Sequence, residues 1–275
     1  IHPPLIEDNP YLAGRAAILA NVNDVYAMGG RPLAVVDTII SPEIKVSSEI
    51  MRGFKDGCSR YDVPIVGGHI TATGYKPAVT VCILGRAKNI LSSFNAQPGD
   101  ILLHVTNLTG SFHPGFQFWN CSSHLSDADL HRDLSILPRI AENGWCDAAR
   151  DISMAGVLGT AIMLLELSGV GAQIELDTLT QPSSSDDRFM DWLLCFPSYG
   201  FVLSVRPWHL SNVQLAFSEY GISCSSIGKV TADHNVKLVK EDEEAVLWDF
   251  DKEHFTGFSS SSDIQTHEFK NGQLN

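Results

Sequence analysis

The pattern of apolar and polar positions predicts alternating helices and strands along the first hundred residues. Apolar runs bounded by glycine or proline indicate strands, and apolar residues recurring at intervals of three and four indicate helices. Residues 1–13 carry several prolines and no clear period, so we expect a lead-in loop or an edge segment there. The elements predicted after it are helices at about residues 14–28 and 47–61, and strands at about residues 33–39, 63–66, 78–84 and 101–105.

The pattern changes after about residue 106. Residues 107–123 are rich in glycine, serine and aromatic residues without a period, which predicts a long loop. Ser126 suits the N-cap of a helix that reaches about residue 143. The whole order of elements is typical of a layered α/β or α+β protein. Later predicted elements are helices at about residues 151–166, 187–194 and 209–220, and strands at about residues 172–176, 201–205, 223–230 and 236–239.

Two polar residues interrupt the apolar face of the first predicted helix. Asn21 and Asp24 lie about one turn apart, on the same face as Ala17 and Met28. Burying an amide and a carboxylate is costly unless they have a hydrogen-bonding partner or bind a ligand. A satisfied polar pair at a helix–helix contact and a binding site are both open at this point.

Asp151 is a second carboxylate beside small residues, at the start of an apolar segment that contains Gly156 and Gly159. The position suits an N-cap, and that structural role alone would explain the aspartate. A helix N-terminus with glycines in its first turns also lets a phosphate or its metal approach backbone amides. Because Mg²⁺ needs one or two carboxylates besides phosphate oxygens and water, Asp24 and Asp151 are candidate metal ligands.

The segment Gly67-Gly68-His69 follows a predicted strand. A tight turn is the default for this segment, and the alternative is an anion-binding nest of backbone N–H groups with His69 as a further donor. Asp37, near the end of another predicted strand, is equally ambiguous. The sequence contains no Walker A, GxGxxG, GxSxG or HExxH pattern.

Composition and charge narrow the class of partner. The chain has 275 residues, 44% of them hydrophobic, which predicts one or two globular domains. A formal net charge of −13 argues against nucleic acid or an acidic membrane surface as partner, whereas phosphates bound through Mg²⁺ and backbone amides stay compatible with it. The six cysteines are widely spread and mostly in apolar runs, so we expect buried thiols and a cytoplasmic location. We expect no membrane span and no signal peptide.

Three motifs together resemble the superfamily of aminoimidazole ribonucleotide (AIR) synthetase, which includes selenophosphate synthetase, thiamine-monophosphate kinase and the hydrogenase-maturation dehydratase. They occur in the family's order, and the resemblance runs from about residue 14 to about residue 257. A closer resemblance, to AIR synthase-related proteins of unassigned activity, rests on Leu167–Ala172 and Phe196–Phe201. The three motifs are Asn21–Pro32, Pro64–His69 and Asp151–Gly159.

The resemblance implies two α/β domains. Residues 1–105 would form an N-terminal domain that builds a β-barrel with its copy in a homodimer, and residues 106–258 a C-terminal α/β domain. We expect residues 259–275 to be a disordered tail. Family members carry a glycine-rich segment and a further strand with aspartates ahead of the first helix, so we expect the N-terminal domain to lack its first segment here.

The resemblance also implies a function. In the family, ATP lies at the junction of the two domains, Mg²⁺ bridges its phosphates to aspartates, and the terminal phosphoryl group is transferred. The chain is therefore expected to transfer phosphate from ATP to a small metabolite, or to activate one. The alternative is a non-catalytic nucleotide- or metabolite-binding dimer that has lost part of the ATP site. Substrate specificity is expected in residues 107–123. The residues carried over by position are Asp24 and Asp151 as metal ligands, Asn21 as a nucleotide contact, and Gly67, Gly68 and His69 near the phosphates or substrate, with His69 the candidate catalytic residue.

Overall fold

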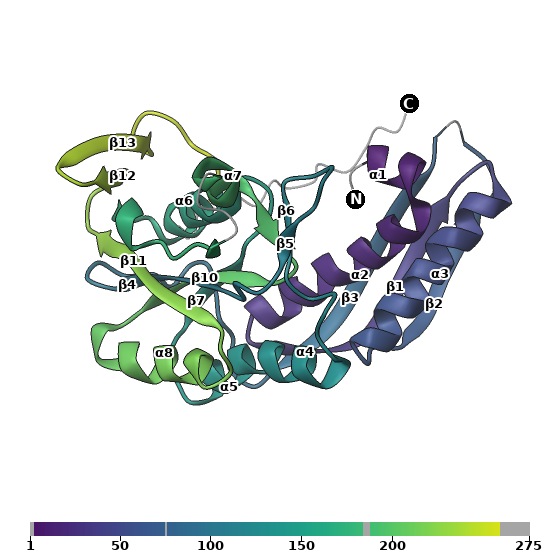
Figure 1. The fold of residues 1–275 in the computed structure, drawn as a ribbon, viewed down its shortest axis with the longest axis horizontal. Coiled ribbons are helices and arrows are strands. Elements are labelled where there is room, and N and C mark those ends of the chain that lie inside the picture. Colours follow the sequence, from purple (N-terminus) through teal and green to yellow (C-terminus); the bar gives the residue numbers. More distant parts are fainter. Residues whose placement is uncertain (1–2, 75, 184–187, 259–275) are drawn as a thin grey trace, which may run out of the picture.

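Two β-sheets of different size organise the chain, each with helices packed on it (Figure 1). The computed structural model describes residues 3–74, 76–183 and 188–258. In the smaller sheet the central strand β1 pairs in parallel with β2 and antiparallel with β3. The elements of this part are α1 (Pro3–Asp8), α2 (Pro10–Ala27), β1 (Gly30–Ile40), α3 (Ile44–Arg60), β2 (Ile65–Thr71) and β3 (Ala78–Ala87).

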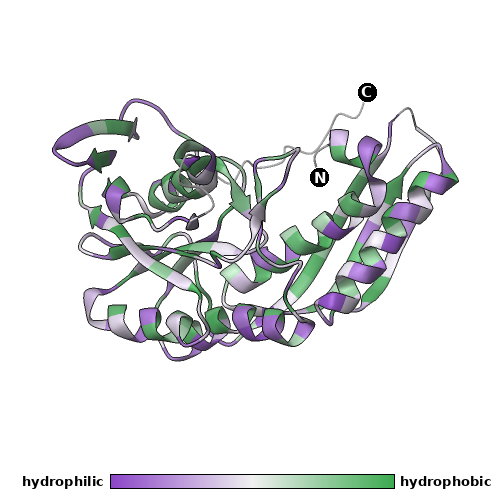
Figure 2. Ribbon diagram, in the orientation of Figure 1, coloured by the Kyte–Doolittle hydropathy of each residue, from purple (hydrophilic) through white to green (hydrophobic). Residues whose placement is uncertain are grey.

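Helices α2 and α3 cover one face of the smaller sheet and leave its other face open. Along β1, Val35 and Ile39 are fully buried toward the helices, while Val36 and Ile40 are exposed on the opposite face. The strands of this sheet are coloured as hydrophobic along most of their length in Figure 2. The smaller sheet therefore presents an apolar surface to solvent.

The two helices approach each other closely at glycines. A Cβ atom on Gly14 would lie 2.3 Å from the carbonyl oxygen of Ile50, and one on Gly53 would lie 2.1 Å from that of Tyr11. Any larger residue at either position would push α2 and α3 apart. This contact fixes the position of α2, which carries Asp24.

The expected lead-in loop at residues 1–13 is wrong for the part that the structure describes. That segment forms α1 and the first turn of α2. Asn9 caps α2 by accepting a hydrogen bond from the backbone N–H of Leu12 at 2.9 Å, and Pro10 occupies the first helical position. Proline is tolerated there because its missing N–H would have no partner within the helix.

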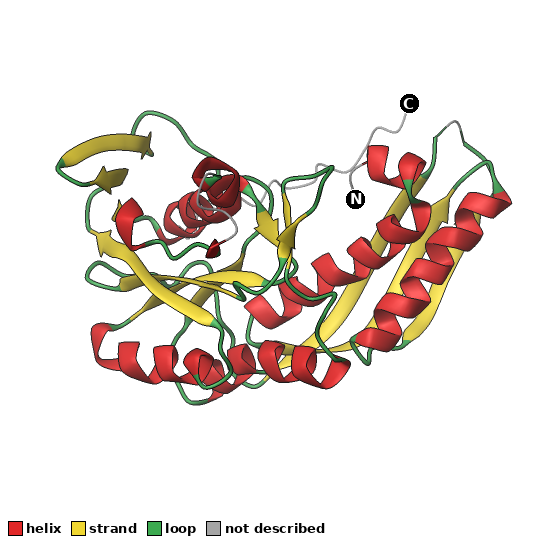
Figure 3. Ribbon diagram, in the orientation of Figure 1, coloured by secondary structure: helices red, strands yellow, loops and turns green. Residues whose placement is uncertain are grey.

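The larger sheet has the strand order β13-β12-β8-β11-β4-β10-β7. Helices α6 and α7 lie on one face, and α4, α5 and α8 on the other (Figure 3). The inner strands β4 and β10 are buried except for the half-buried first residue of β4, as their apolar runs predict. The elements are β4 (Ile101–Thr106), α4 (Asp127–Leu134), α5 (Ile136–Glu142), β7 (Ala148–Asp151), α6 (Gly156–Ser168), β8 (Gly171–Glu175), α7 (Phe189–Leu194), β10 (Gly200–Val205), α8 (Leu210–Ser218), β11 (Ser223–Thr231), β12 (Asn235–Lys240) and β13 (Glu243–Asp249), with short 3₁₀ turns η1 (Leu176–Thr178) and η3 (Pro207–His209).

The segment expected as a long loop contains two short strands. β5 (Ser111–Phe112) and β6 (Phe118–Asn120) pair with β9 (Phe196–Pro197) in a third, small sheet. Trp119 anchors this sheet, because its ring is fully buried and its indole N–H donates to the carbonyl of Asn107 at 2.9 Å. Strands this short gave no alternating pattern by which the sequence could reveal them.

The predicted helix at about residues 126–143 is two helices, α4 and α5, which meet at Ser135. The N-cap assigned to Ser126 is confirmed, since its hydroxyl accepts from the backbone N–H of Asp129 at 3.1 Å.

The domain boundary expected near residue 105 stays a prediction, and β4 already belongs to the larger sheet. The expected disordered tail, residues 259–275, lies outside the described residues. None of the helices in the described ranges has the length and apolar character needed to cross a membrane.

Candidate functional site

The structure brings Asp24 and Asp151 together from segments far apart in the sequence. Helix α2 packs against β7, the edge strand of the larger sheet, so the C-terminal half of α2 lies beside the end of that strand. Asp24 is exposed to solvent and Asp151 is half-buried. Each carboxyl group affects the pKa of the other, which places the two side chains close together.

Burial of both groups, together with the charge of Asp151 acting on Asp24, holds a proton on this pair more tightly than usual. Burial and then the charge of Asp151 raise the pKa of Asp24 from 3.8 to about 6, while Arg150 acts in the opposite direction. Burial also raises the pKa of Asp151, again opposed by Arg150. Two carboxylates held close together in this way favour a bound cation or a shared proton.

Asp151 does not have the N-cap role that the sequence suggested. It is the last residue of β7, and α6 begins five residues later at Gly156. The connecting turn ends with Ala155 at φ +70° and Gly156 at φ +63°, both in the left-handed region. A Cβ atom on Gly156 would lie 2.0 Å from the carbonyl oxygen of Leu193, so this glycine is required for packing against α7. The carboxylate of Asp151 is thus left without a capping role.

The two asparagines of α2 have different roles. Asn21, the expected nucleotide contact, is half-buried and donates to the carbonyl of Ala17 at 2.9 Å within its own helix. Asn23 is 6% exposed and donates to the carbonyl of Ser198 at 2.8 Å, across the contact between α2 and the C-terminal part. Its side-chain oxygen has no partner among the described residues. Sequence reasoning missed Asn23, because only the partner at Ser198 distinguishes it from a surface amide.

The structure does not bring Gly67, Gly68 and His69 to the carboxylate pair. They lie inside β2, with Gly68 opposite Asp37 and His69 opposite Thr38 of β1. All three are exposed, on the outer strand beneath α3 rather than beside α2. Neither the tight turn nor the nest forms, because the segment is an extended strand, in which successive N–H groups point to opposite sides. Their predicted phosphate or substrate contact stays a prediction.

Asp37 is a buried carboxylate on β1 of the smaller sheet. It is 5% exposed, and neither carboxyl oxygen has a hydrogen-bonding partner in the described part of the chain. A Cβ atom on Gly68 would lie 2.7 Å from its Oδ2, so Gly68 is what leaves room for the carboxyl group. Burial raises the pKa of Asp37. The ambiguous aspartate of the sequence is therefore a buried group on the helix side of the sheet.

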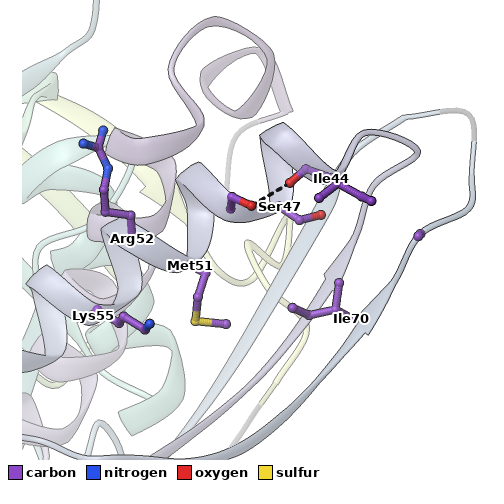
Figure 4. Close-up of a pocket in the computed structure, with 8 residues that line it drawn as sticks. Ile44, Ser47, Met51, Arg52, Lys55 and Ile70 are labelled. Carbon is purple, nitrogen blue, oxygen red and sulfur yellow. Dashed lines mark hydrogen bonds between the residues drawn. The ribbon is translucent and has the colours of Figure 1, made fainter.

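A groove of about 370 Å³ lies between α3 and β2, away from the carboxylate pair. Figure 4 shows Met51 and Lys55 of α3 on one side and Ile70 of β2 on the other. The groove is open, and its lining contains no acidic residue. Its size alone therefore does not connect it with the chemistry suggested by Asp24 and Asp151.

The donor atoms of the pair suit magnesium. Mg²⁺ prefers carboxylate oxygens, uses one or two of them, and completes its shell with water and phosphate oxygens. In the part of the chain that the structure describes, no group of three or more histidine, cysteine, aspartate or glutamate side chains could hold a metal. The pair therefore fits a magnesium ion shared with a phosphate ligand and does not fit an all-protein metal cage.

Family comparison agrees with the motifs. A family model described as AIR synthase related protein, N-terminal domain, matches residues 1–87, and the corresponding C-terminal domain matches residues 97–241. The chain belongs to the AIR synthase-related family. The resemblance stated from the sequence is thereby confirmed. An uncharacterized protein of Synechocystis is 42% identical over 94% of this chain and 80% of its own length.

Solved structures of other proteins share the fold. PurL of Thermotoga maritima, complexed with ATP, superimposes with a TM-score of 0.71 at 18% identity, over 89% of this chain and 41% of PurL. AaThiL, complexed with AMPPCP and TMP, gives a TM-score of 0.64 at 19% identity, over 87% of this chain and 81% of AaThiL. The chain thus spans less than half of PurL. The predicted α/β fold is confirmed, whereas the described residues form no closed barrel.

Proposed function

We propose that this AIR synthase-related chain uses ATP and Mg²⁺ to transfer a phosphoryl group to a small metabolite, or to activate one. The observation that carries the proposal is the meeting of Asp24 and Asp151, two carboxylates from separate layers with raised pKa values, neither of which forms an ion pair with a basic side chain among the described residues. Structural neighbours solved with ATP or an ATP analogue support a nucleotide as the ligand.

Asp24 and Asp151 would hold the magnesium ion, which when bound neutralises phosphate charge in phosphoryl transfer. The protein's own contribution is to fix the distance between the two carboxylates. Asn23, next to Asp24, ties α2 to the carbonyl of Ser198, two residues before β10. β10 in turn pairs with β7, with Phe201 opposite Asp151. This route of backbone contacts holds the pair together in the absence of a ligand.

The acceptor substrate is proposed to lie against the small third sheet. His113 and Phe116 stack with ring centroids 5.0 Å apart, and Phe118 lies 5.2 Å from Phe196, all of them half-buried. β9 of this sheet is followed directly by Ser198, which binds Asn23 of α2. Specificity is therefore assigned, as part of this proposal, to residues 107–123.

We also propose that the chain forms a homodimer through the open face of the smaller sheet. Val36, Ile40 and Leu84 are exposed there, with Leu84 63% exposed. A contiguous apolar face of this kind on a sheet marks an interaction surface. A second copy of the same face would be complementary in shape and polarity, and two such sheets would build the barrel that the family resemblance implies.

A non-catalytic nucleotide- or metabolite-binding dimer is the second candidate. The described residues place neither Gly67-Gly68-His69 nor a third acidic residue beside the pair, and this favours a site that binds without turnover. The catalytic and the non-catalytic function differ in whether ATP is converted to ADP. A catalytic protein releases ADP from ATP when its acceptor or water is present, whereas the non-catalytic dimer leaves ATP intact.

Calorimetry with MgATP tests the proposal. The wild-type chain should bind, and Asp24→Ala and Asp151→Ala should each weaken binding at least about tenfold, because each removes a charged metal ligand. Asp242→Ala, at the turn between β12 and β13, is the matched control with the same charge change. No binding, or equal binding by all four proteins, refutes a metal–nucleotide site at the pair. Measuring ADP over hours then separates the catalytic from the non-catalytic function.

A further inference from the structure

The groove between α3 and β2 has the size and composition of a small-molecule site. Its volume is about 370 Å³, and ligand pockets in proteins range from about 300 to 1,000 Å³. Such pockets are mostly apolar and contain a few polar groups that orient the ligand. Here Ile44, Met51 and Ile70 supply apolar surface, and serine and basic side chains of α3 supply the polar groups (Figure 4).

One stripe of α3 forms a wall of this groove. Its members recur at intervals of three and four residues and therefore share one face of the helix. They are Ile44, Ser47, Met51 and Lys55. Since a helix rises about 1.5 Å per residue, Ser47 and Lys55 are about 12 Å apart along its axis. A ligand lying along the wall would meet a hydroxyl toward one end, the methionine in the middle and an ammonium group at the other end.

Ser47 is a buried residue whose hydroxyl has no partner. The residue is 6% exposed, and its side chain makes no hydrogen bond within the described ranges. The next serine, Ser48, donates to the carbonyl of Ile44 at 2.9 Å, as serines inside helices commonly do. Burying a polar group is costly unless it is hydrogen-bonded. Because Ser47 lines the groove, its free hydroxyl indicates a ligand that offers a polar atom there.

Lys55 gives the groove a free positive charge. The other basic residue of the lining, Arg52, binds Glu49 at 2.5 Å and lies over the ring of Tyr11, 4.5 Å from its centroid. Figure 4 shows that Arg52 and Met51 leave α3 in different directions. Lys55 is exposed and forms no ion pair or hydrogen bond with the described residues. In a chain of net charge −13, a groove with a free cation and no acidic lining residue favours an anion.

The groove is separate from the carboxylate pair and from the proposed dimer face. Ile70 lies opposite Ile39, which is fully buried toward the helices, so the groove is on the helix side of the smaller sheet. The proposed dimer uses the opposite face. Figure 1 shows α3 and β2 at the outer end of the molecule, whereas α2 lies nearer the larger sheet. A ligand in the groove therefore competes neither with the metal nor with a second copy.

We propose that this groove is a second binding site, for a small organic acid with an apolar body. The carboxylate or phosphate of the ligand pairs with the ammonium group of Lys55. Its apolar body lies between Met51 and Ile70, and a polar atom toward its other end bonds to the hydroxyl of Ser47. The site goes beyond phosphoryl transfer and does not depend on it, because none of these residues contacts the carboxylate pair.

Nuclear magnetic resonance of isotope-labelled methionine methyl groups in the full chain measures this binding. Of the five methionines, Met51 lines the groove, whereas Met28, Met154 and Met190 are exposed elsewhere. The probe ω-hydroxyoctanoate should shift the Met51 signal and leave the signals of the exposed three in place. Its neutral analogue ω-hydroxyoctanamide should bind about threefold more weakly, the difference that one exposed ion pair makes. Comparison with ω-hydroxyoctyl phosphate identifies which of the two acids the groove prefers.

Four variants assign the contacts. Lys55→Gln should bind ω-hydroxyoctanoate about threefold more weakly and bind the amide as wild type does. Lys45→Gln makes the same charge change on α3 outside the lining and should behave as wild type. Ser47→Ala should weaken ω-hydroxyoctanoate about threefold, from the loss of one hydrogen bond, and should leave octanoate unchanged. Ala72→Phe fills the groove from an exposed position just after β2, and should abolish the Met51 shift with every probe.

Equal shifts of Met51 and of the exposed methionines would show general binding to apolar surface and overturn the inference. So would equal affinity for the acid and its amide, equal weakening by Lys55→Gln and Lys45→Gln, or a Met51 shift that persists in Ala72→Phe. If Ser47→Ala fails to fold, judged by its unfolding midpoint, octanoate and ω-hydroxyoctanoate are compared on the wild-type chain. Equal affinity for those two acids then removes the contact with Ser47 and overturns the site as proposed.

Discussion

Replacing Asp24 by asparagine should stabilise the metal-free protein while removing its response to magnesium. Asp24 lies against Asp151, and its pKa is raised from 3.8 to about 6 by burial and by that neighbour's charge. Asparagine keeps the shape and hydrogen-bonding capacity of the side chain but removes one of the two negative charges. A group held at a cost to stability is expected where function requires it.

The size of this stabilisation follows from the rise in the pKa of Asp24. A rise of roughly two pKa units corresponds to about 3 kcal/mol if the group were fully buried. Because Asp24 is exposed to solvent, solvent screening reduces the expected gain to about 1 kcal/mol. The folded chain binds more protons than the unfolded chain between pH 3.8 and about 6, so this group's contribution to stability falls as pH rises through that window. The gain from Asp24→Asn is therefore fully present above about pH 6 and absent below pH 3.8.

Urea unfolding at pH 8 and pH 4, with and without magnesium, measures both effects. At a magnesium concentration about ten times Kd, the wild-type chain should gain about 1.4 kcal/mol and Asp24→Asn nothing. Asp242→Asn is the control, since it makes the same exchange at an exposed turn. A loss of stability in Asp24→Asn at pH 8 would show that the pair is a structural hydrogen bond. An equal response of both proteins to magnesium would place the metal elsewhere.

Three further predictions concern the rest of the chain. Asp37→Asn should raise the free energy of unfolding, measured with urea at pH 8, by about 1 kcal/mol, because it removes a buried charge that has no partner among the described residues. Burial raises the pKa of Asp37 in the folded state, so this gain in stability should vanish below pH 3.8. A loss of stability at pH 8 would instead reveal a partner for the carboxylate. Glu166→Gln should lower the free energy of unfolding by about 1–3 kcal/mol at pH 7 and should speed proteolysis after Trp248. The reason is that the carboxylate of Glu166 accepts hydrogen bonds from the backbone N–H groups of Phe255 and Thr256 at 2.7 Å. Although burial raises the pKa of Glu166, these hydrogen bonds lower it below 4.5. The difference in stability between wild type and Glu166→Gln should therefore disappear as pH falls below that lowered pKa. Equal proteolysis of both proteins at pH 7 would contradict the contact of Glu166 with Phe255 and Thr256. Leu84→Arg should convert a dimer into a monomer in sedimentation velocity, since it charges the open face, whereas a wild-type chain that sediments as a monomer would refute the dimer.

The strongly patterned elements could be predicted from the sequence. Buried strands such as β4 and β10 are short apolar runs flanked by turn residues, and their bounds were found to within a residue or two. The apolar segment of α6 was found as a helix, but its start was placed at Asp151 instead of Gly156. An aspartate before small residues reads equally well as an N-cap or as the end of a strand, because both precede a helix.

The partners of the site residues could not be read from the sequence. Nothing in the local pattern around Asn23 tells that its amide reaches Ser198, or that Asp24 meets Asp151. These contacts arise where α2 meets β7, and they depend on the packing of two layers rather than on spacing within one segment. Neither the tight turn nor the nest considered at Gly67-Gly68-His69 forms, because pairing with β1 keeps that segment extended.

The central claim is that Asp24 and Asp151 form one metal site, and a crystal grown with Mn²⁺ and an ATP analogue tests it most directly. Anomalous scattering at the manganese edge locates the ion without reference to the protein density. The account predicts a peak between the two aspartates, with an oxygen of each about 2.1–2.2 Å from the metal and phosphate or water oxygens completing the shell. Nucleotide bound with manganese held by other residues, or with the two carboxylates still sharing a proton, would contradict it.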